Sequence, residues 1–598
     1  MTDVESRAAV SSRRLYNTSL LFVAGLGGLL YGIDIGIIGG ALPYLEATSS
    51  LNAGQLSVIV AAVLLGSVIS TLFAGLLADR VGRRLMMIMS GTIFAISIPI
   101  IALSHGYGPL FTGRLLQGIS GGFIGVVVPL YLAECLTSST RGRGTGIFQW
   151  LLTLGIVVAA LIGMFYSYRI NALTQVAGAA ALFAAKDQAW RNIFWISLPP
   201  GIFFVIGSLL VTESPRWLHR QGKRELAFAA LLRSRNAEMA TREMNEMEAT
   251  APAHRQRGSG ERSRETLLQR KYVLPFLLAC LILFCNTATG VNSIIGYNTG
   301  ILLQSGLTDL GAHWGYVIFT LVNFLMTLVG LSLVDRVGRR LLLMTGTAGL
   351  IICVTLIALL FRQTEQQSVD CRQAVQAWSG SGGQVVLHFD TAAAERLLST
   401  SGYDTRTIEG KPSALVIIYS YGGFSAATTF VRSDYAGGSS IQLKRDGCIP
   451  SNRVEAFFRN PFADLAAARI APLKIDRALV SPVPDRRHGW LVALGLYGFI
   501  AFFAIGPGVC VWLALSELMP TRIRSVGMSI ALVINQSVST ILAVLFLPFV
   551  SKYGYSTLFF TFGGFTVVYF LTALFLLPET KGKTLEEIGE LFITHKVT

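Results

Sequence analysis

Long apolar runs separated by short polar loops recur along most of this chain. Each run holds about 20 residues or more, the length that an α-helix needs to cross the hydrocarbon core of a bilayer. The pattern predicts an all-α membrane protein in which six spanning helices precede, and six follow, a polar linker. The predicted spans lie near residues 18–44, 55–78, 85–104, 110–134, 146–168, 190–211, 273–303, 313–334, 341–361, 489–515, 526–550 and 555–577.

The same pattern divides the chain into seven parts. Two six-helix domains are expected, and a long polar insertion interrupts the second of them between helices 9 and 10. The parts are an N-terminus at 1–17, the first six-helix domain at 18–211, a linker at 212–272, the first part of the second domain at 273–361, the insertion at 362–488, the rest of the second domain at 489–577 and a tail at 578–598.

Basic residues predict the orientation of the chain in the membrane. Arg13 and Arg14 precede the first span, and the short loops at 79–84, 141–143, 335–340 and 522–524 are also basic. Lys and Arg are enriched in cytoplasmic loops. Both termini and the linker are therefore expected in the cytoplasm, and the insertion is expected to be soluble and extracytoplasmic. The expected location is a cell membrane, of the bacterial inner-membrane type.

The composition excludes an ordinary soluble protein. The chain is 52% hydrophobic and only 14% charged, whereas soluble proteins average about 25% charged residues. The net charge is +15, but no basic-aromatic pattern of a nucleic-acid groove is present. Membrane lipid, and not nucleic acid, is therefore the expected surrounding. No metal-ligand spacing or nucleophile–base cluster is evident, so we expect no cofactor, no metal and no enzymatic activity.

A short basic motif is repeated and indicates that the chain consists of two related halves. Asp-Arg-Val-Gly-Arg-Arg occurs at 79–84 and again at 335–340, each time between two apolar runs. Glu134 precedes Arg141 by seven residues, and Glu517 precedes Arg524 by the same seven. Parallel halves of this kind are common in transporters that work by alternating access.

The repeat also locates the insertion. Asp79 and Glu134 are 55 residues apart, whereas Asp335 and Glu517 are 182 apart, and the excess of 127 equals the length of 362–488. Within the insertion, strands are predicted at 384–390 and 413–419 and a helix at 391–398.

The insertion contains two cysteines, Cys371 and Cys448. An extracytoplasmic compartment permits disulfides, so these cysteines either form a bridge or remain two thiols, and the sequence leaves both alternatives open.

Asp34 is a carboxylate well inside the first predicted span. Such residues are costly in a membrane and by default mark a transport or proton pathway with a nearby partner. Arg114, which opens the fourth span, is the best candidate partner. The proton role is favoured over two alternatives: a permanent Asp–Arg ion pair, and a hydrated Asp34 near the membrane surface.

Five motifs in a fixed order resemble the sugar porter family of the major facilitator superfamily. They are the two Asp-Arg-Val-Gly-Arg-Arg loops, Pro129-Leu-Tyr-Leu-Ala-Glu134 followed by Arg141, Glu213-Ser-Pro-Arg-Trp-Leu218, and Pro578-Glu-Thr-Lys-Gly-Lys583. They cover the chain except the insertion and the extreme ends. The resemblance implies the major facilitator fold, with two pseudo-symmetric halves, a central sugar site and alternating access.

The resemblance also implies a cytoplasmic gate of charged residues that pair in the outward-open state and separate when the cytoplasmic side opens. The alternative for any one of them is a simple topology anchor. The gate residues are Asp79, Arg83, Glu134, Arg141, Glu213, Arg216, Asp335, Arg339, Glu517 and Arg524.

Sugar-binding positions are implied by the same resemblance, since amides offer both a donor and an acceptor to neighbouring hydroxyl groups. The alternative for each is an interhelical hydrogen bond. The expected binding residues are Gln149, Asn286, Thr287, Asn292, Asn323, Trp512 and Asn535. Three features depart from the family pattern: Asn286-Thr287 replaces Gln-Gln, Val509 and Val511 replace prolines, and Gln536 replaces a tryptophan.

The sequence therefore predicts a monomeric, proton-coupled symporter of a monosaccharide or polyol. An aspartate at position 34 favours symport over a facilitative uniporter, because facilitators of the resembled family commonly carry a neutral residue there. The competing hypotheses are a non-transporting sugar sensor, an enzyme housed in the insertion and a drug or organic-ion transporter.

Overall fold

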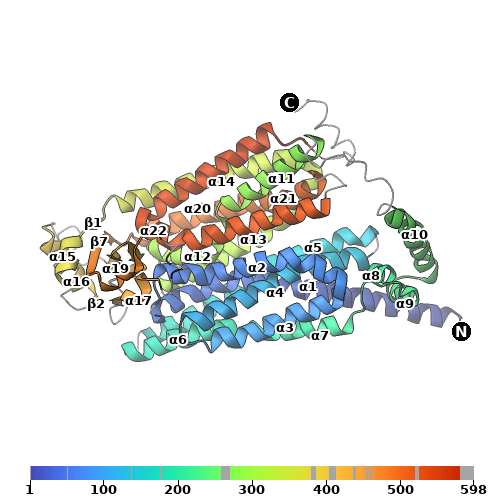
Figure 1. Ribbon diagram of the computed structural model, residues 1–598, viewed down its shortest axis with the longest axis horizontal. Helices are drawn as coiled ribbons and strands as arrows, with labels where there is room; N and C mark the ends of the chain where they lie inside the picture. Colours follow the sequence, from blue (N-terminus) through green and yellow to red (C-terminus); the bar gives the residue numbers. More distant parts are fainter. Residues whose placement is uncertain are drawn as a thin grey trace.

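The computed structural model contains two helical bundles that lie side by side (Figure 1). It describes residues 2–579 apart from 50, 137, 175–177, 257–269, 379–384, 403–411, 435–438, 451–452, 454–455, 457–459, 461 and 519–523. The first bundle comprises α1 (Thr2–Thr48), α2 (Ala53–Val81), α3 (Arg83–Ala102), α4 (Tyr107–Cys135), α5 (Ser138–Thr174), α6 (Ala179–Trp195) and α7 (Leu198–Leu210). The second comprises α11 (Arg270–Ala288), α12 (Val291–Gln304), α13 (Asp309–Val337), α14 (Arg339–Glu365), α20 (Arg486–Ile505), α21 (Pro507–Leu518) and α22 (Arg524–Phe575).

Eleven helical segments in the described residues are long and apolar enough to cross a membrane. The last of them, Ile530–Phe575, has 46 residues, whereas one crossing needs about 20. Gly554 interrupts it with a non-helical φ of 84°, so that two helices meet there. The helical prediction is confirmed. The count of twelve spans stays a prediction, which the break at Gly554 supports.

Glycines allow the helices of the first bundle to pack backbone against backbone. A Cβ atom on Gly118 of α4 would lie 2.0 Å from the carbonyl oxygen of Val63 of α2. A Cβ on Gly32 of α1 would lie 1.9 Å from the carbonyl oxygen of Leu152 of α5. Small residues at helix crossings permit this close approach in membranes, where helix association depends on packing.

The two ends of the bundles carry different structures (Figure 1). At one end, here called the terminal end, lie the first residues of α1 and three helices of the linker, α8 (Pro215–Arg220), α9 (Arg224–Ser234) and α10 (Ala237–Gln256). At the opposite end, here called the insertion end, lies the α/β segment that joins α14 to α20.

The α/β segment is built on an antiparallel sheet with the order β1-β7-β3-β4, and β5 also pairs with β3. The predicted strands and helix form as β2, β3 and α16, and a separate ladder pairs β2 with β6. The strands are β1 (Val369–Asp370), β2 (Val385–Phe389), β3 (Ser413–Tyr421), β4 (Phe424–Ala427), β5 (Val431–Arg432), β6 (Ser439–Leu443) and β7 (Leu473–Pro482). The helices are α15 (Arg372–Trp378), α16 (Thr391–Thr400), α17 (Arg445–Cys448) and α19 (Leu465–Ile470).

Cys371 and Cys448 are buried in the apolar core of this segment, and the structure forms no disulfide between them. The Cys448 Sγ donates a hydrogen bond to the carbonyl oxygen of Phe424 (3.2 Å). Burial raises the pKa of the Cys371 thiol, which favours its neutral form. Of the two alternatives that the sequence left open, the structure therefore contains the two thiols.

The insertion contacts both bundles. Arg432 of β5 donates to the carbonyl oxygen of Leu303 (2.7 Å), in the last turn of α12, and to that of Leu307 (3.1 Å), which lies beyond the end of this helix. On the other side, the Asn52 side chain, which caps α2, donates to the carbonyl oxygen of Gly447 (2.5 Å). The segment thus lies across the boundary between the bundles at the insertion end.

Candidate functional site

Asp34 of α1 and Arg114 of α4 are both buried, with 1% of each side chain exposed. Among the residues that the structure describes, neither carboxylate oxygen of Asp34 has a hydrogen-bond partner. The Arg114 guanidinium donates instead to Gln117 (2.6 Å) and lies 5.5 Å from the centre of the Phe194 ring. The Asp34 and Arg114 charges are close enough to attract each other, but they form no ion pair within 4.0 Å in the described residues. The proton role of these two residues stays a prediction.

Gly121 of α4 leaves the space in which the Asp34 carboxylate lies. A Cβ atom there would be 2.9 Å from Asp34 Oδ2 and 3.2 Å from the Tyr31 ring. A larger residue at this position would therefore displace the carboxylate.

Three of the expected binding residues are brought together where α11 and α12 pack against α22. The Asn292 amide donates to the hydroxyl of Ser539 (2.8 Å). The Asn535 amide donates to the carbonyl oxygen of Leu283 (3.0 Å) and to the hydroxyl of Thr287 (3.4 Å). In this state Asn292, Asn535 and Thr287 make the interhelical hydrogen bonds that the alternative interpretation expected.

The other expected binding residues are placed differently. Asn286 of α11 is buried, and its side-chain oxygen has no hydrogen-bond partner. Asn323 of α13 is buried and Gln149 of α5 is half-buried, and in the described part of the chain neither side chain is hydrogen-bonded to that cluster. Trp512 belongs to α21, but its side chain lies outside the described ones.

Sequence reasoning missed three polar residues in the spans. Gln117 is the hydrogen-bond partner of Arg114, and Ser539 is the partner of Asn292. Asn298 of α12 is fully buried, and both its polar atoms lack a partner. A search for every amide or hydroxyl one helical turn from an expected site residue would have found Gln117, three residues after Arg114, and Ser539, four residues after Asn535.

A charge network lies at the terminal end of the first bundle. Arg83 is 1% exposed, and its guanidinium contacts Asp79 (2.8 Å) and Glu134 (2.8 Å). Glu134 also accepts from the Ser214 hydroxyl (2.5 Å) and from Arg220 (2.7 Å). The network joins α2, α3, α4 and α8, which all precede the second bundle in the chain. In the described residues it therefore connects helices on one side of the bundle boundary only.

Among the described residues Arg216 does not join this network, and its role in the gate stays a prediction. It is exposed, and within the described residues Arg220 provides the α8 cation in its place. The Ser214 hydroxyl caps α8 by accepting a hydrogen bond from the Trp217 amide (3.2 Å). The same hydroxyl donates to one carboxylate oxygen of Glu134. Arg220, at the end of α8, reaches the other oxygen.

Glu213 accepts backbone hydrogen bonds in place of a side-chain ion pair. Its carboxylate receives the amide N–H groups of Arg83 (2.9 Å) and Arg84 (3.1 Å) at the start of α3. A carboxylate there satisfies free N–H groups and complements the positive end of the helix dipole. Gly82, with φ 99°, forms the turn between α2 and α3.

The same junction occurs in the second Asp-Arg-Val-Gly-Arg-Arg copy. Gly338 has φ 101°, and Glu579 accepts from the amides of Arg339 (3.1 Å) and Arg340 (3.1 Å) at the start of α14. The Arg339 guanidinium donates to the carbonyl oxygen five residues before it, as the Arg83 guanidinium does. Glu579 lies in one of the five motifs, but the sequence assigned it no role.

A third junction of this type lies at the insertion end. Gly554 has φ 84°, and Glu365 accepts from the amide of Ser556 (3.1 Å) and from its hydroxyl. A Cβ atom on Gly82, Gly338 or Gly554 would approach the capping carboxylate to 2.3, 2.7 or 2.6 Å, respectively. Each junction thus combines a glycine with positive φ and a glutamate from a distant part of the chain.

The side chains of four further expected gate residues lie outside the described ones. They are Arg141, Asp335, Glu517 and Arg524.

We expect Gly82→Ala and Gly338→Ala to lower the thermal stability of the detergent-solubilised protein. A side chain at positive φ costs on the order of 1–3 kcal/mol, and the added Cβ also contacts the capping carboxylate. Gly75→Ala is the matched control, because Gly75 lies in α2 with open space around its Cβ position. Thermal midpoints of the two junction variants equal to that of Gly75→Ala would contradict the prediction.

Side-chain hydrogen bonds join the two bundles at the insertion end. Tyr316 donates to the carbonyl oxygen of Gly36 (2.9 Å), and the His313 ring contacts the carbonyl oxygen of Gly40 (3.3 Å). Asp309 accepts from the hydroxyl groups of Tyr44 (2.9 Å) and Ser167 (2.5 Å), both in the first bundle. The bundles are therefore in direct polar contact on the side that carries the insertion.

Comparison with known proteins shows the family. A family model described as sugar (and other) transporter matches residues 20–382 and 478–592, so the unmatched stretch lies inside the insertion. The chain belongs to the sugar porter family of the major facilitator superfamily, whose members are membrane transporters and not enzymes.

Some of the relatives that match over nearly the whole chain are named for inositol transport. The human proton myo-inositol cotransporter is 26% identical over 579 residues, which cover 95% of this chain and 81% of that protein. The major myo-inositol transporter IolT of Bacillus subtilis is 25% identical over 577 residues, which cover 96% and 94%.

Solved structures support the fold. The xylose transporter XylE of E. coli, in a partially occluded inward-open conformation, matches with a TM-score of 0.61 at 17% identity, over 94% of this chain and all of that one.

Proposed function

We propose that this protein is a proton-coupled symporter of a monosaccharide or cyclic polyol. The observation that carries the proposal is Asp34, a buried carboxylate without a hydrogen-bond partner that lies near Arg114 but forms no ion pair with it. A carboxylate held between burial, which favours its neutral form, and a nearby cation, which favours its charged form, is suited to load and release a proton.

The substrate class is inferred from the polar groups of the second bundle. Asn292, Asn535 and Thr287 form one cluster, and Asn286 beside Thr287 has a buried oxygen that is open to a donor. Neighbouring hydroxyl groups of a sugar or polyol offer such donors and acceptors in pairs. Both relatives named above carry inositol in their names, so a cyclic polyol is the first candidate. Binding would exchange the interhelical hydrogen bonds for bonds to the substrate.

The proposed topology places the terminal end in the cytoplasm and the insertion end outside. It follows the distribution of basic residues, with twelve spans and a monomeric protein in a membrane of the bacterial inner type. In this orientation the hydrogen bonds of Tyr316, His313 and Asp309 close the outer side of the substrate path. Opening to the outside would have to break them, together with the contact between Asn52 and Gly447.

Proteoliposomes with a pH gradient, acidic outside, test the proposal. Labelled myo-inositol, D-xylose and D-glucose are offered separately, and a protonophore is added at steady state. We expect one of them to accumulate above the external concentration and to leave when the protonophore is added. Equilibration without accumulation would identify a uniporter in its place. Binding without any uptake would identify a sensor.

A further inference from the structure

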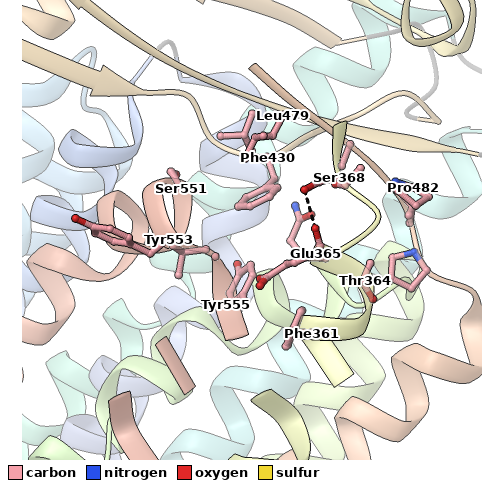
Figure 2. Close-up of a pocket in the computed structure, with 18 of the residues that line it drawn as sticks. Phe361, Thr364, Glu365, Ser368, Phe430, Leu479, Pro482, Ser551, Tyr553 and Tyr555 are labelled. Carbon is pink, nitrogen blue, oxygen red and sulfur yellow. Dashed lines mark hydrogen bonds between the residues drawn. The ribbon is translucent and has the colours of Figure 1, made fainter. Parts of the chain in front are cut away.

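A cavity of about 320 Å³ lies at the insertion end, between the α/β segment and the second bundle (Figure 2). This volume falls at the lower end of the range for small-molecule sites, roughly 300–1,000 Å³. Its walls come from β3 and β7 of the insertion, from the end of α14 and from the turn around Gly554. None of the transport residues discussed above lines it, apart from Glu365 and Gly554 of the third junction.

One side of the cavity is aromatic. The Phe430 ring lies 5.8 Å from the Tyr555 ring, which stacks on Phe361 at 4.8 Å. Figure 2 shows Phe430 reaching in from the insertion and Tyr555 and Phe361 from the bundle below it. Aromatic faces of this kind pack against the C–H faces of sugar and polyol rings, with their polar groups left free at the ring edge.

The other side is polar. Thr364, Glu365 and Ser368 follow one another on the last turn of α14 and the residues after it, and all three line the cavity. The Ser368 hydroxyl already donates to the carbonyl oxygen of Glu365 (2.7 Å), so it offers its lone pairs to a ligand, and a carboxylate accepts at up to about four positions. Such a set matches the vicinal hydroxyl groups of a polyol.

Glu365 is held in place by the junction described above. Its two oxygens accept from the amide and the hydroxyl of Ser556. These bonds fix the carboxylate, and the lone pairs that they do not use remain available to a ligand. Preorganisation of this kind lowers the entropic cost of binding.

The described residues that line the cavity belong to the second bundle and the insertion, and none of them to the first bundle. The cavity would therefore persist while the two bundles move relative to each other. It also includes Gln304 at the end of α12, the helix whose terminal carbonyl oxygens Arg432 binds.

We propose that this cavity is a second binding site for a neutral monosaccharide or cyclic polyol, separate from the central site. The ligand class rests on the proposed function, since the substrate would arrive at this end. The exposed cations Arg477 and Lys552 also line the cavity. Because these side chains would attract an anion, an anionic ligand is the alternative to a neutral one.

Equilibrium binding of labelled myo-inositol and D-xylose to the full-length protein in nanodiscs tests the site. We expect two sites per protein. Asn292→Ala should weaken one of them, and Phe430→Ala should weaken the other by roughly tenfold through loss of the aromatic wall. Glu365→Gln keeps the shape but weakens the acceptor, and it should affect the same site as Phe430→Ala. Phe462→Ala is the matched control, because Phe462 lies in the insertion with 95% of its side chain exposed.

Several outcomes would overturn the second site. The first is a single binding site that Asn292→Ala alone removes. The second is an affinity that neither Phe430→Ala nor Glu365→Gln changes. The third is binding of inorganic phosphate or glucose 6-phosphate in place of the neutral probes. Failure of the proposed function has a different signature: binding that depends on Phe430 would persist while proteoliposomes accumulate no substrate.

Discussion

Asp34→Asn is expected to abolish pH-driven accumulation while exchange of labelled for unlabelled substrate continues. Asn keeps the size of the side chain but cannot carry a proton, so substrate movement would no longer be linked to the gradient. Each unit of pH difference supplies about 1.4 kcal/mol, which supports about tenfold accumulation in one-to-one symport. The variant should lose this whole factor and only equilibrate its substrate. The measurement is the steady-state ratio of internal to external substrate in proteoliposomes.

The control for this variant is Asp476→Asn, which removes a carboxylate from the insertion that pairs only loosely with Lys474 (3.7 Å). It should accumulate substrate as the unchanged protein does. Undiminished accumulation by Asp34→Asn would show that the proton is carried elsewhere and would remove the main support for symport through this residue. Loss of both exchange and accumulation would indicate a structural defect. The thermal stability of the same sample distinguishes such a defect from a specific loss of proton coupling.

Glu134→Ala is expected to produce the largest loss of stability among the charge-network variants. Arg83 is almost completely buried, and Glu134 is its buried partner, whereas Asp79 is 59% exposed. Removing one partner of a buried pair costs about 3–5 kcal/mol, because the remaining charge is left uncompensated. The Ser214 hydroxyl and Arg220 lose their acceptor at the same time. The thermal midpoint and the yield of folded protein should both fall.

Two arginines of α8 provide a graded comparison. Arg220→Ala should lower stability by about 0–1 kcal/mol, the range for exposed ion pairs, because the Arg220 side chain is 55% exposed. Arg216→Ala should have no measurable effect, since Arg216 is exposed and joins none of the ion pairs described for this region. An Arg216 effect larger than that of Arg220 would show that a different conformation uses the residue predicted from the family pattern.

Much of the architecture could be predicted from the sequence, because it depends on local and periodic properties. The length of each apolar run sets whether a helix can span a membrane, so the helical prediction needed no tertiary information. The duplicated hexapeptide revealed two related halves and located the insertion. Asp34 was recognisable because a carboxylate in an apolar run is costly wherever the helix packs. Strands β2 and β3 could be predicted from their β-branched and aromatic residues.

The tertiary structure decided which distant groups meet. The three glycine junctions are capped by Glu213, Glu579 and Glu365, each contributed by a segment far away in the chain. No local pattern encodes such a contact, because it depends on how helices pack. The choice of Arg220 over Arg216 depends in the same way on where α8 lies relative to Glu134.

The amide cluster and the cavity also arose only from packing. The sequence indicated Asn292 and Asn535 as polar residues in apolar spans, but their partners on neighbouring helices follow from the approach of α22 to α11 and α12. The cavity exists because the insertion covers the end of the second bundle without filling the space above α14. Sequence alone thus determined the family, the helices and the position of a carboxylate within the first span, since these depend on composition and order along the chain. The contacts that hold the junctions and shape the second site were decided by the tertiary structure, since they require surfaces from separate segments to come together.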